Sequence, residues 1–538
     1  MKKLFSTLLL IIVFWHANGQ FTLADTLRGS ITPERAWWDL NAYALDIEVD
    51  PEKKWIGGSN DVFFTAIETG QVMQIDLQHP MKLTGADMNG MTLKIEKISP
   101  HVYHIQLKEP MTKGQKGRVH LSYEGYPKKA VNAPWDGGFS WSTNKEGLPF
   151  IATSCQNLGS SVWWPCKDHM YDEPDSMTIA VTVPKPLMNV SNGRLIKEED
   201  LGTKRKFTWS VNNPINNYCV SLNIAPYASM HEVYNGQKGQ LDLTYYVLPE
   251  NQVQAKNQFK QVTQMLNAFE YWFGPYPFYE DGYQLVQVPY LGMEHQSAVA
   301  YGNQFKNGYL GSDLSGTGWG LKWDYIIIHE SGHEWFANNI TYKDIADMWI
   351  HEGFTTYSEA LFTEFHYGKE AGQAYVIGQR KNIRNEAPII GQYDVNNEGS
   401  GDMYYKGANL LNMIRQINNN DSLWREMLRE MNQFYFYHKT VTTSDVELFM
   451  TDYLKLNLKP IFDQYLRTKF IPKLEIKKQR GKHYFRWQNC INDFEMPLDL
   501  IINGKNYRTK VTTEWNPING KCKKGKIKID QNYYILTK

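Results

Sequence analysis

The sequence has no excess of charge of either sign. Lysine and arginine together number 57, aspartate and glutamate together also number 57, and the formal net charge is zero. Proteins that bind nucleic acid or an anionic membrane surface are usually biased toward basic residues. We therefore expect neither nucleic acid nor an anionic membrane surface as a partner.

Long hydrophobic runs are also scarce. The strongest one is at the N-terminus, where Lys2 and Lys3 precede an apolar run over residues 8–15, and the small residues Ala17 and Gly19 follow. This run is too short for a spanning helix, which needs about 20 apolar residues. Its three parts are those of a secretory signal peptide. We expect cleavage after Gly19, no stable membrane anchor after cleavage, and an exported protein that is periplasmic or extracellular.

Cysteine is rare, with five residues in the whole chain. An odd number in an exported protein leaves at least one thiol outside any intramolecular disulfide. Cys490 and Cys522 are the two cysteines of the C-terminal part, and export would expose them to oxidising conditions. A disulfide between these two residues is therefore a candidate that the sequence leaves open.

The first half of the chain has the pattern of β-structure. A length of 538 residues predicts more than one domain, because single hydrophobic cores stop growing near about 250–300 residues. From about residue 40 to 230, short runs alternate between polar and apolar residues, as in 43–49, 102–107 and 177–183. Turn residues separate these runs, which is typical of antiparallel sheets.

The pattern then changes to helix and later returns to strand. Apolar residues recur at helical spacing from Phe259 to Phe269, and Gly274 is predicted to end this helix. Further amphipathic runs cover 406–416, 422–434 and 444–456, and alternation returns in 473–476, 483–487 and 526–530.

The most informative stretch is residues 325–337, which we predict to be one buried helix that carries His329, Glu330 and His333 in the pattern HExxH. Histidines four positions apart share one face of a helix, with Cβ atoms about 6 Å apart, so both imidazoles can reach one zinc ion. Glu330 can then act as general base toward a water on the metal. The alternative is a core helix with incidental histidines.

A second segment, residues 347–359, offers a third ligand. Glu352 follows His333 after 18 intervening residues. That spacing suits a carboxylate from the next antiparallel helix and completes the His2Glu set of a catalytic zinc site, with one zinc ion per chain. A metzincin would need a glycine and a third histidine where Phe336 and Asn339 stand. The metzincin alternative therefore fails.

Two further motifs flank these in the sequence. Gly292-Met-Glu-His295 precedes them, and Met403-Tyr-Tyr-Lys-Gly407 follows them. In this order the motifs resemble those of the gluzincin zinc aminopeptidases, a metallopeptidase family typified by aminopeptidase N and leukotriene hydrolase. The resemblance implies a multidomain α+β fold. Its parts would be an N-terminal antiparallel β domain, a thermolysin-like and mostly helical catalytic domain, and a small C-terminal β-sandwich. We place the signal peptide at 1–19 and the three domains at 20–234, 235–468 and 469–538.

The resemblance also implies a substrate site. Glu294 matches the glutamate that accepts the free α-ammonium of the substrate, and Gly292 and Met293 belong to the same substrate-binding motif. Gln156 matches a residue that reaches the amino end of the substrate. His295 stands where the family usually has asparagine.

Further roles follow from the positions of a tyrosine and a glutamate. Tyr404 matches the family's catalytic tyrosine, which donates a hydrogen bond to the oxyanion, and Tyr405 is the alternative. Glu359 lies on the same helical face as Glu352. It could orient a zinc-bound histidine, or it could be a solvated or capping residue.

We therefore expect a zinc-dependent aminopeptidase that hydrolyses the N-terminal peptide bond with a metal-activated water. Its partners would be peptides with a free N-terminus, and the sequence carries no indication of oligomeric state. A thermolysin-like endopeptidase and a leukotriene-hydrolase-like epoxide hydrolase could use the same zinc motif. Outside enzymes, the alternative is a catalytically silent peptide-binding protein.

Overall fold

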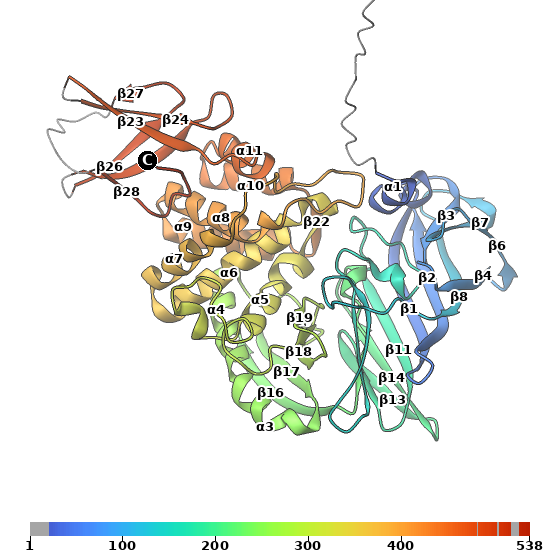
Figure 1. The fold of residues 1–538 in the computed structure, drawn as a ribbon. Coiled ribbons are helices and arrows are strands. Elements are labelled where there is room, and N and C mark those ends of the chain that lie inside the picture. Colours follow the sequence, from blue (N-terminus) through green and yellow to red (C-terminus); the bar gives the residue numbers. More distant parts are fainter. Residues whose placement is uncertain (1–20, 481, 503–504, 518–526, 538) are drawn as a thin grey trace, which may run out of the picture.

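The computed structural model describes residues 21–480, 482–502, 505–517 and 527–537. The chain passes from an N-terminal β domain through a mostly helical domain to a small C-terminal β domain (Figure 1). The predicted multidomain α+β fold is confirmed. The signal peptide expected at 1–19 and the cysteine at position 522 lie outside the described residues. Export and the Cys490–Cys522 disulfide therefore stay predictions.

A large sheet forms the body of the N-terminal domain. Its strands follow the order β13 (Arg194–Asp200), β14 (Lys204–Val211), β11 (Ser176–Pro184), β1 (Trp38–Asp50), β2 (Trp55–Ala66), β8 (Lys116–Gly125), β4 (Lys82–Met88) and β5 (Met91–Thr92). The pairs are antiparallel, as predicted, except that β1 and β11 run parallel. These strands are distant in the sequence, so no hairpin forces them into opposite directions.

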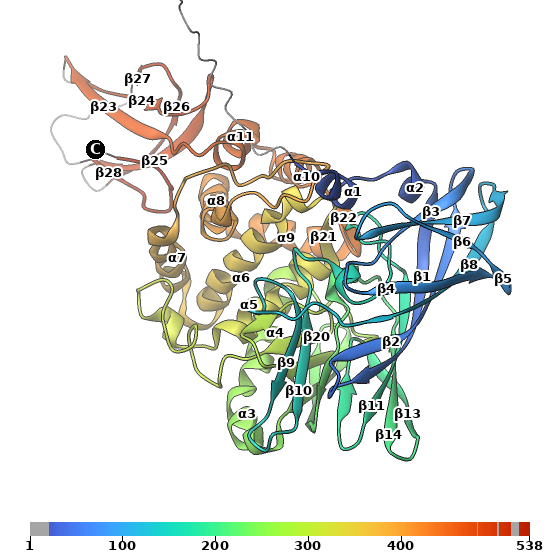
Figure 2. The same cartoon turned by 45° about the vertical axis from the view of Figure 1, so that its right-hand side comes forward.

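Smaller elements surround this sheet. One small sheet has the order β3 (Gly70–Asp76), β7 (Val102–Met111) and β6 (Lys94–Lys97), and another has the order β12 (Met188–Val190), β15 (Asn223–Ala225), β10 (Pro149–Ser154) and β9 (Gly138–Thr143). The β9–β10 hairpin (Figure 2) contacts the middle domain, where the Tyr290 hydroxyl donates to the Thr153 carbonyl of β10 at 2.6 Å. The chain begins with the helices α1 (Leu23–Gly29) and α2 (Pro33–Ala36).

The middle domain contains its own sheet, in the order β16 (Ala228–Gly236), β17 (Gly239–Val247), β18 (Tyr283–Gln287), β20 (Ala298–Tyr301) and β19 (Gly292–Met293). β16 pairs with β17 along its whole length. The sheet therefore begins at Ala228, before the boundary predicted at residue 235. The reason is that the hairpin holds β16 to the catalytic domain. β19 lies at the opposite edge of the sheet and pairs with β20 alone among the described strands.

Helices pack on this sheet and on one another. They are α3 (Gln252–Gln258), α4 (Lys260–Phe273), α5 (Tyr325–Gly332), α6 (Trp349–Tyr367), α7 (Lys369–Gly378), α8 (Tyr405–Asn418), α9 (Asp421–Glu430), α10 (Thr443–Leu454) and α11 (Lys459–Arg467). α6 is buried from Trp349 to Thr363 and packs against α4, α5, α7 and α8. In the described part of the chain, no helix has the length and apolar character to cross a membrane.

In its described part, the C-terminal domain consists of two small sheets, which agrees with the predicted β-sandwich. One sheet has the order β23 (Lys473–Gln479), β24 (Lys482–Gln488) and β27 (Asn516–Pro517), and the other has the order β26 (Lys505–Val511), β25 (Met496–Ile502) and β28 (Ile527–Ile529). Side chains such as Trp487 and Leu498 fill the space between the sheets and continue the hydrophobic core of the helical domain. The domain is therefore packed onto its neighbour rather than tethered to it.

Candidate active site

Helix α5 carries His329 and Glu330, and His333 directly follows its last residue, Gly332. The helix begins with a strong cap. The Asp324 carboxylate accepts hydrogen bonds from the backbone N–H groups of Ile326 (3.1 Å) and Ile327 (3.4 Å), which would otherwise be unpaired at the helix start. The helix ends at Gly332, and Phe336 has non-helical dihedral angles (φ −127°, ψ 76°). The prediction of one helix through residue 337 is therefore wrong at its end. The break turns the Phe336 carbonyl back toward the ring of His333.

The three predicted metal ligands meet in the structure. The Nε2 atoms of His329 and His333 lie 3.6 Å and 3.5 Å from Glu352 Oε2. All three residues are buried, and among the described residues their ligand atoms form a group that could hold one metal ion. Glu352 Oε2 is buried and has no hydrogen-bond partner in the described structure. A buried carboxylate oxygen facing two imidazole nitrogens is the arrangement that a cation would stabilise, and His2Glu suits zinc.

The far side of the His329 ring is held by a carboxylate. His329 Nδ1 lies 2.7 Å from Glu359 Oε1, and Glu359 is fully buried. Its other oxygen accepts hydrogen bonds from Tyr375 Oη (2.6 Å) and Gln379 Nε2 (2.9 Å). The prediction that Glu359 orients a metal-binding histidine is therefore confirmed as a contact, and the solvated alternative is wrong. With Nδ1 occupied, Nε2 is the nitrogen that remains for the metal.

The ring of His333 is fixed by uncharged groups. Its Nδ1 donates to the Phe336 carbonyl at 3.0 Å and lies 3.0 Å from the Thr355 hydroxyl. Each histidine therefore presents Nε2 to the same point in space. This orientation is what a preformed metal site requires, because a ring free to rotate would lose entropy on binding.

A contact between two glycines brings the tyrosine motif to the metal ligands. A Cβ atom on Gly407 would lie 2.9 Å from the Gly353 Cα atom, so a larger residue could not be placed there without moving α6 and α8 apart. This close approach seats Tyr404 with its ring centroid 6.2 Å from that of His329. Burial, and then the nearby Glu352 carboxylate, raise the pKa of Tyr404 well above its ordinary value. Its hydroxyl is therefore a protonated hydrogen-bond donor.

The predicted amine-binding residues come from both large domains. Gln156, from the N-terminal domain, donates from Nε2 to Glu294 Oε1 at 2.6 Å and to Glu352 Oε1 at 2.9 Å. The Tyr218 hydroxyl donates to Glu294 Oε1 at 3.2 Å. Burial is the main cause of the raised pKa of Glu294. One amide side chain thus links the predicted ammonium acceptor to a predicted metal ligand.

Glu330 lies between these two groups of residues. Burial raises the pKa of Glu330 to about 7, although the neighbouring His329 opposes that rise. A Cβ atom on Gly292 would lie only 2.7 Å from Glu330 Oε1, so glycine lets β19 pass close to this carboxylate. A carboxylate that titrates near neutral pH is suited to accept and return a proton.

All the predicted site residues line one cavity of about 640 Å3. They are Gln156, Gly292, Met293, Glu294, His329, Glu330, His333, Glu352 and Tyr404. Tyr405 also lines the cavity, so its position alone does not separate it from Tyr404. The structure brings the predicted residues together, and their individual roles remain predictions.

Sequence reasoning missed several residues of this site. Tyr218 supports Glu294 from the N-terminal domain, and Glu398 lines the cavity from a loop before α8. Neither residue belongs to a local motif. Glu334 accepts hydrogen bonds from the Ser297 N–H (3.0 Å) and the Tyr276 hydroxyl (2.8 Å), and so holds the turn after Glu294. A charged residue inside the apolar run that carries HExxH was the signal that could have identified Glu334.

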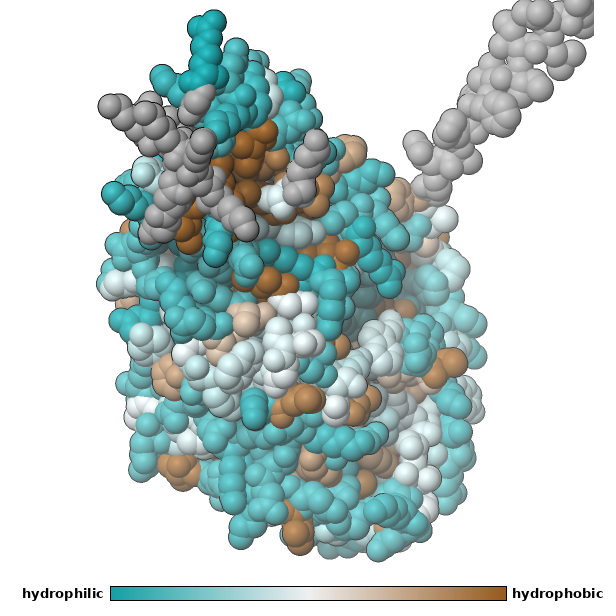
Figure 3. All heavy atoms as spheres, turned by 60° about the vertical axis from the view of Figure 1, so that its left-hand side comes forward, coloured by the Kyte–Doolittle hydropathy of each residue, from teal (hydrophilic) through white to brown (hydrophobic). Residues whose placement is uncertain are grey.

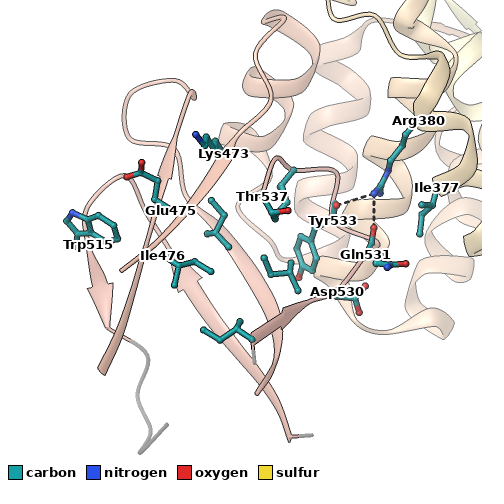
Figure 4. Close-up of a pocket in the computed structure, with 14 residues that line it drawn as sticks. Ile377, Arg380, Lys473, Glu475, Ile476, Trp515, Asp530, Gln531, Tyr533 and Thr537 are labelled. Carbon is teal, nitrogen blue, oxygen red and sulfur yellow. Dashed lines mark hydrogen bonds between the residues drawn. The ribbon is translucent and has the colours of Figure 1, made fainter. Parts of the chain in front are cut away.

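A separate cavity of about 750 Å3 lies in the C-terminal domain (Figure 4). Isoleucine side chains form much of its wall, and Arg380 donates to the Gln531 and Tyr533 carbonyls at the end nearest the helical domain. Hydrophobic residues gather over this part of the surface (Figure 3). None of the predicted site residues lines this cavity, so it is not part of the candidate active site.

Comparison with known proteins places both large domains in the same family. The peptidase family M1 domain matches residues 257–465, and the peptidase M1 N-terminal domain matches residues 40–219. Leukotriene A-4 hydrolase of Xenopus laevis is 24% identical over 455 residues, which cover 79% of this chain and 69% of that protein. Glutamyl aminopeptidase of Homo sapiens is 22% identical over 405 residues, which cover 71% of this chain.

Solved structures show the same fold. An M1 zinc metallopeptidase from Deinococcus radiodurans superposes with a TM-score of 0.67 at 21% identity, covering 81% of this chain and 96% of that chain. A mutant of the M1 zinc metallopeptidase from that organism has also been solved with a Tyr-Ser-Ala substrate. The chain spans only part of several longer relatives, including 40% of the human glutamyl aminopeptidase and 48% of leucyl aminopeptidase from Saccharolobus solfataricus.

Proposed function

The chain belongs to peptidase family M1, whose members in the comparison are zinc metallopeptidases, and we propose that it removes residues from the free N-terminus of peptides. One observation carries this proposal. The buried Glu294 carboxylate lies beside the metal ligands and is joined to Glu352 through the side chain of Gln156. An ammonium group held at Glu294 would bring the first peptide bond of a substrate to the metal ligands.

The selectivity for a free amine follows from electrostatics. A desolvated carboxylate favours a positively charged partner, and removing one member of such a pair costs on the order of 2–5 kcal/mol. An internal peptide bond or an acetylated N-terminus offers Glu294 no such charge. A substrate that lacks the ammonium would therefore leave this carboxylate buried and unpaired.

Zinc held by His329, His333 and Glu352 would supply Lewis acidity and lower the pKa of water at the site. Glu330 would accept the proton of the attacking water and deliver it to the leaving amine. The Tyr404 hydroxyl would donate a hydrogen bond to the developing oxyanion. Loss of one such donor costs about 3 kcal/mol in other enzymes.

The edge strand β19 gives the substrate backbone a place to bind. Gly292 and Met293 pair on one side with β20, and among the described strands none pairs with their other side. Both residues line the cleft. An extended peptide could add to this edge through backbone hydrogen bonds, which hold a substrate without selecting its sequence.

The names of the relatives indicate different substrates, and the residues that line the cleft do not favour an acidic one. Glutamyl aminopeptidase is named for an acidic residue. In the present chain, the described residues that line the cleft include no lysine or arginine. An acidic substrate side chain would therefore meet no positive side chain there.

Export remains part of the proposal. Its support is the three-part pattern in residues 1–19, which lie outside the described structure. N-terminal sequencing of the mature protein would test it: a mature chain that begins at Gln20 is expected, and one that keeps Met1 would contradict it.

The decisive experiment compares Tyr-Ser-Ala with its N-acetylated form, with and without a chelator. An aminopeptidase should release tyrosine from the free peptide alone and should lose activity on chelation. Equal cleavage of internal bonds in blocked peptides would favour an endopeptidase. Binding without turnover would favour a silent peptide-binding protein, and activity confined to a lipid epoxide would favour an epoxide hydrolase.

A further inference from the structure

A glutamate that the mechanism does not use lines the catalytic cleft. Glu398 shares the cavity with Gln156, Glu294 and Glu352, but it belongs to an irregular segment before α8. It is neither one of the candidate metal ligands nor one of the residues that hold them in place. Its carboxylate is therefore available to a substrate.

The segment around Glu398 is held firmly in place. The Ser400 N–H donates to the Ile389 carbonyl at 3.3 Å, and the Asn397 side chain accepts from the Gln392 N–H at 2.9 Å. Gly399 has a φ of +82°, and a Cβ atom there would lie 2.1 Å from the Ile389 carbonyl oxygen. The backbone next to Glu398 thus closes on itself through contacts that only glycine permits.

The N-terminal domain holds the same segment from the other side. The Asn396 N–H donates to the Asp25 carbonyl at 3.3 Å. A Cβ atom on Gly29 would lie 2.2 Å from the Val395 backbone, so α1 packs directly on this segment. The backbone that carries Glu398 is therefore held by both domains.

Neighbouring groups place Glu398 at the amine end of the cleft. It lines the cavity together with Asn157, the residue that follows Gln156. A residue whose α-ammonium is at Glu294 would have Glu398 within reach of a long side chain.

The charges in the cleft leave one negative charge unbalanced. Four carboxylates line the cavity, from Glu294, Glu330, Glu352 and Glu398, and the described lining includes no lysine or arginine. When all four are ionised, a zinc ion balances two of the charges and a substrate ammonium balances a third. In the described structure no lysine, arginine or histidine forms a salt bridge with Glu398. A positively charged substrate side chain would balance the fourth charge.

We propose that Glu398 is a specificity-determining residue that selects arginine or lysine as the N-terminal residue of the peptide substrate. This inference rests on the proposed aminopeptidase function and names its substrate class. Charge pairing in a partly desolvated cleft is the source of the preference. A guanidinium can pair with the carboxylate through two parallel hydrogen bonds, so arginine should be preferred to lysine.

The test uses matched aminoacyl-coumarin substrates. Arginine is compared with citrulline, and lysine with norleucine, since each pair has nearly the same size but differs in charge. The wild-type enzyme should show a kcat/KM for arginine roughly 10- to 100-fold above that for citrulline. E398Q should remove most of this difference and should leave the value for citrulline within about twofold.

D394N is the matched control. Asp394 is an exposed residue of the same segment that does not line the cleft, and its φ of +61° is one that asparagine tolerates well. D394N removes one negative charge nearby and should keep the arginine preference. An equal loss of that preference in D394N would show a general effect of charge and would overturn the proposal.

Several outcomes would contradict the role of Glu398. A wild-type enzyme that hydrolyses arginine and citrulline equally would overturn it, as would an unchanged arginine-to-citrulline ratio in E398Q. A parallel loss on all substrates would show that Glu398 supports the ammonium site or the fold instead. If no aminoacyl-coumarin is hydrolysed by the wild-type enzyme, the proposed function itself fails.

Discussion

The metal end of the cleft and its amine end are assembled differently. The metal ligands come from α5 and α6, helices that are close in the sequence, and residues of the same domain hold both histidine rings. At the amine end, Gln156 and Tyr218 of the N-terminal domain meet Glu294 of the catalytic domain. The metal end is thus complete within one domain, whereas the amine end exists only where two domains pack together.

Because the two ends of the cleft are assembled differently, mutations at each end should have different effects. Changes at the metal end should alter metal affinity or the chemical step for every substrate. Changes at the amine end should alter how the substrate is positioned and which substrates are accepted, while the metal stays bound. The Gln156 side chain touches both Glu294 and Glu352, so a change at Gln156 should affect both ends of the cleft.

The largest expected effect is that of E330Q at the metal end. Glutamine has nearly the same shape but cannot accept the proton of the attacking water, so kcat should fall by about 10²- to 10⁴-fold. The zinc content should not change, because Glu330 is not one of the predicted ligands. The measurements are kcat on an aminoacyl-coumarin and zinc per chain by atomic absorption. Retained turnover would show that another group is the base.

At the amine end, E294Q should have the second-largest effect on activity. Loss of the ammonium partner should cost on the order of 2–5 kcal/mol in kcat/KM, or roughly 30-fold or more, with normal zinc content. The loss should be confined to substrates with a free amine. If kcat/KM for these substrates stays the same, the ammonium is held elsewhere and the two ends of the cleft are not distinct in function.

A smaller effect is expected from E359Q, which changes the support of His329 but not a ligand. Loss of the charged partner at Nδ1 should weaken zinc binding by about 10- to 100-fold. Competition with a chelator measures this affinity, and E370Q, on the exposed surface of α7, is the control. At saturating zinc, KM should match that of the wild type. An unchanged zinc affinity would mean that the His329–Glu359 contact does not prepare the site.

The smallest expected effect is on how the folding stability of the protein depends on pH, and it comes from His295 at the amine end of the cleft. His295 is fully buried, and burial lowers its pKa from 6.5 to about 3. Between these pH values the unfolded chain binds one more proton than the folded chain, so His295 makes the protein less stable as pH falls below about 6.5. In H295N, urea unfolding should depend less steeply on pH between 7 and 5 than in the wild type. Equal pH dependence would mean that His295 is not buried as a neutral ring.

The sequence predicted the metal end more completely than the amine end. The predicted metal ligands, the general base and the supporting Glu359 all lie in short motifs, and all of them meet as expected. At the amine end Glu294 and Gln156 were predicted from the resemblance, but Tyr218 and Glu398 were not. The reason is that these residues approach from loops whose positions depend on how the two domains pack.

Boundaries were less predictable than the elements themselves. The HExxH helix ends at Gly332, and the His333 ring donates to the Phe336 carbonyl, which a continuing helix would have used in its own hydrogen bonding. The catalytic sheet begins at Ala228 because a hairpin extends it backward along the chain. Both corrections arise from pairing partners that the alternation of polar and apolar residues does not identify.

The sequence by itself determined the metal-binding chemistry, because helical periodicity places His329 and His333 on one face whatever surrounds them. It also determined the family, through motifs that occur in a fixed order. Only the tertiary structure decided that Tyr218 and Glu398 lie beside the predicted residues Glu294 and Gln156. Gln156, Tyr218 and Glu398 are separated in the chain by long segments, and no local rule relates their positions. Burial of the surfaces between the domains brings Gln156 and Glu398 to one cleft and Tyr218 against Glu294.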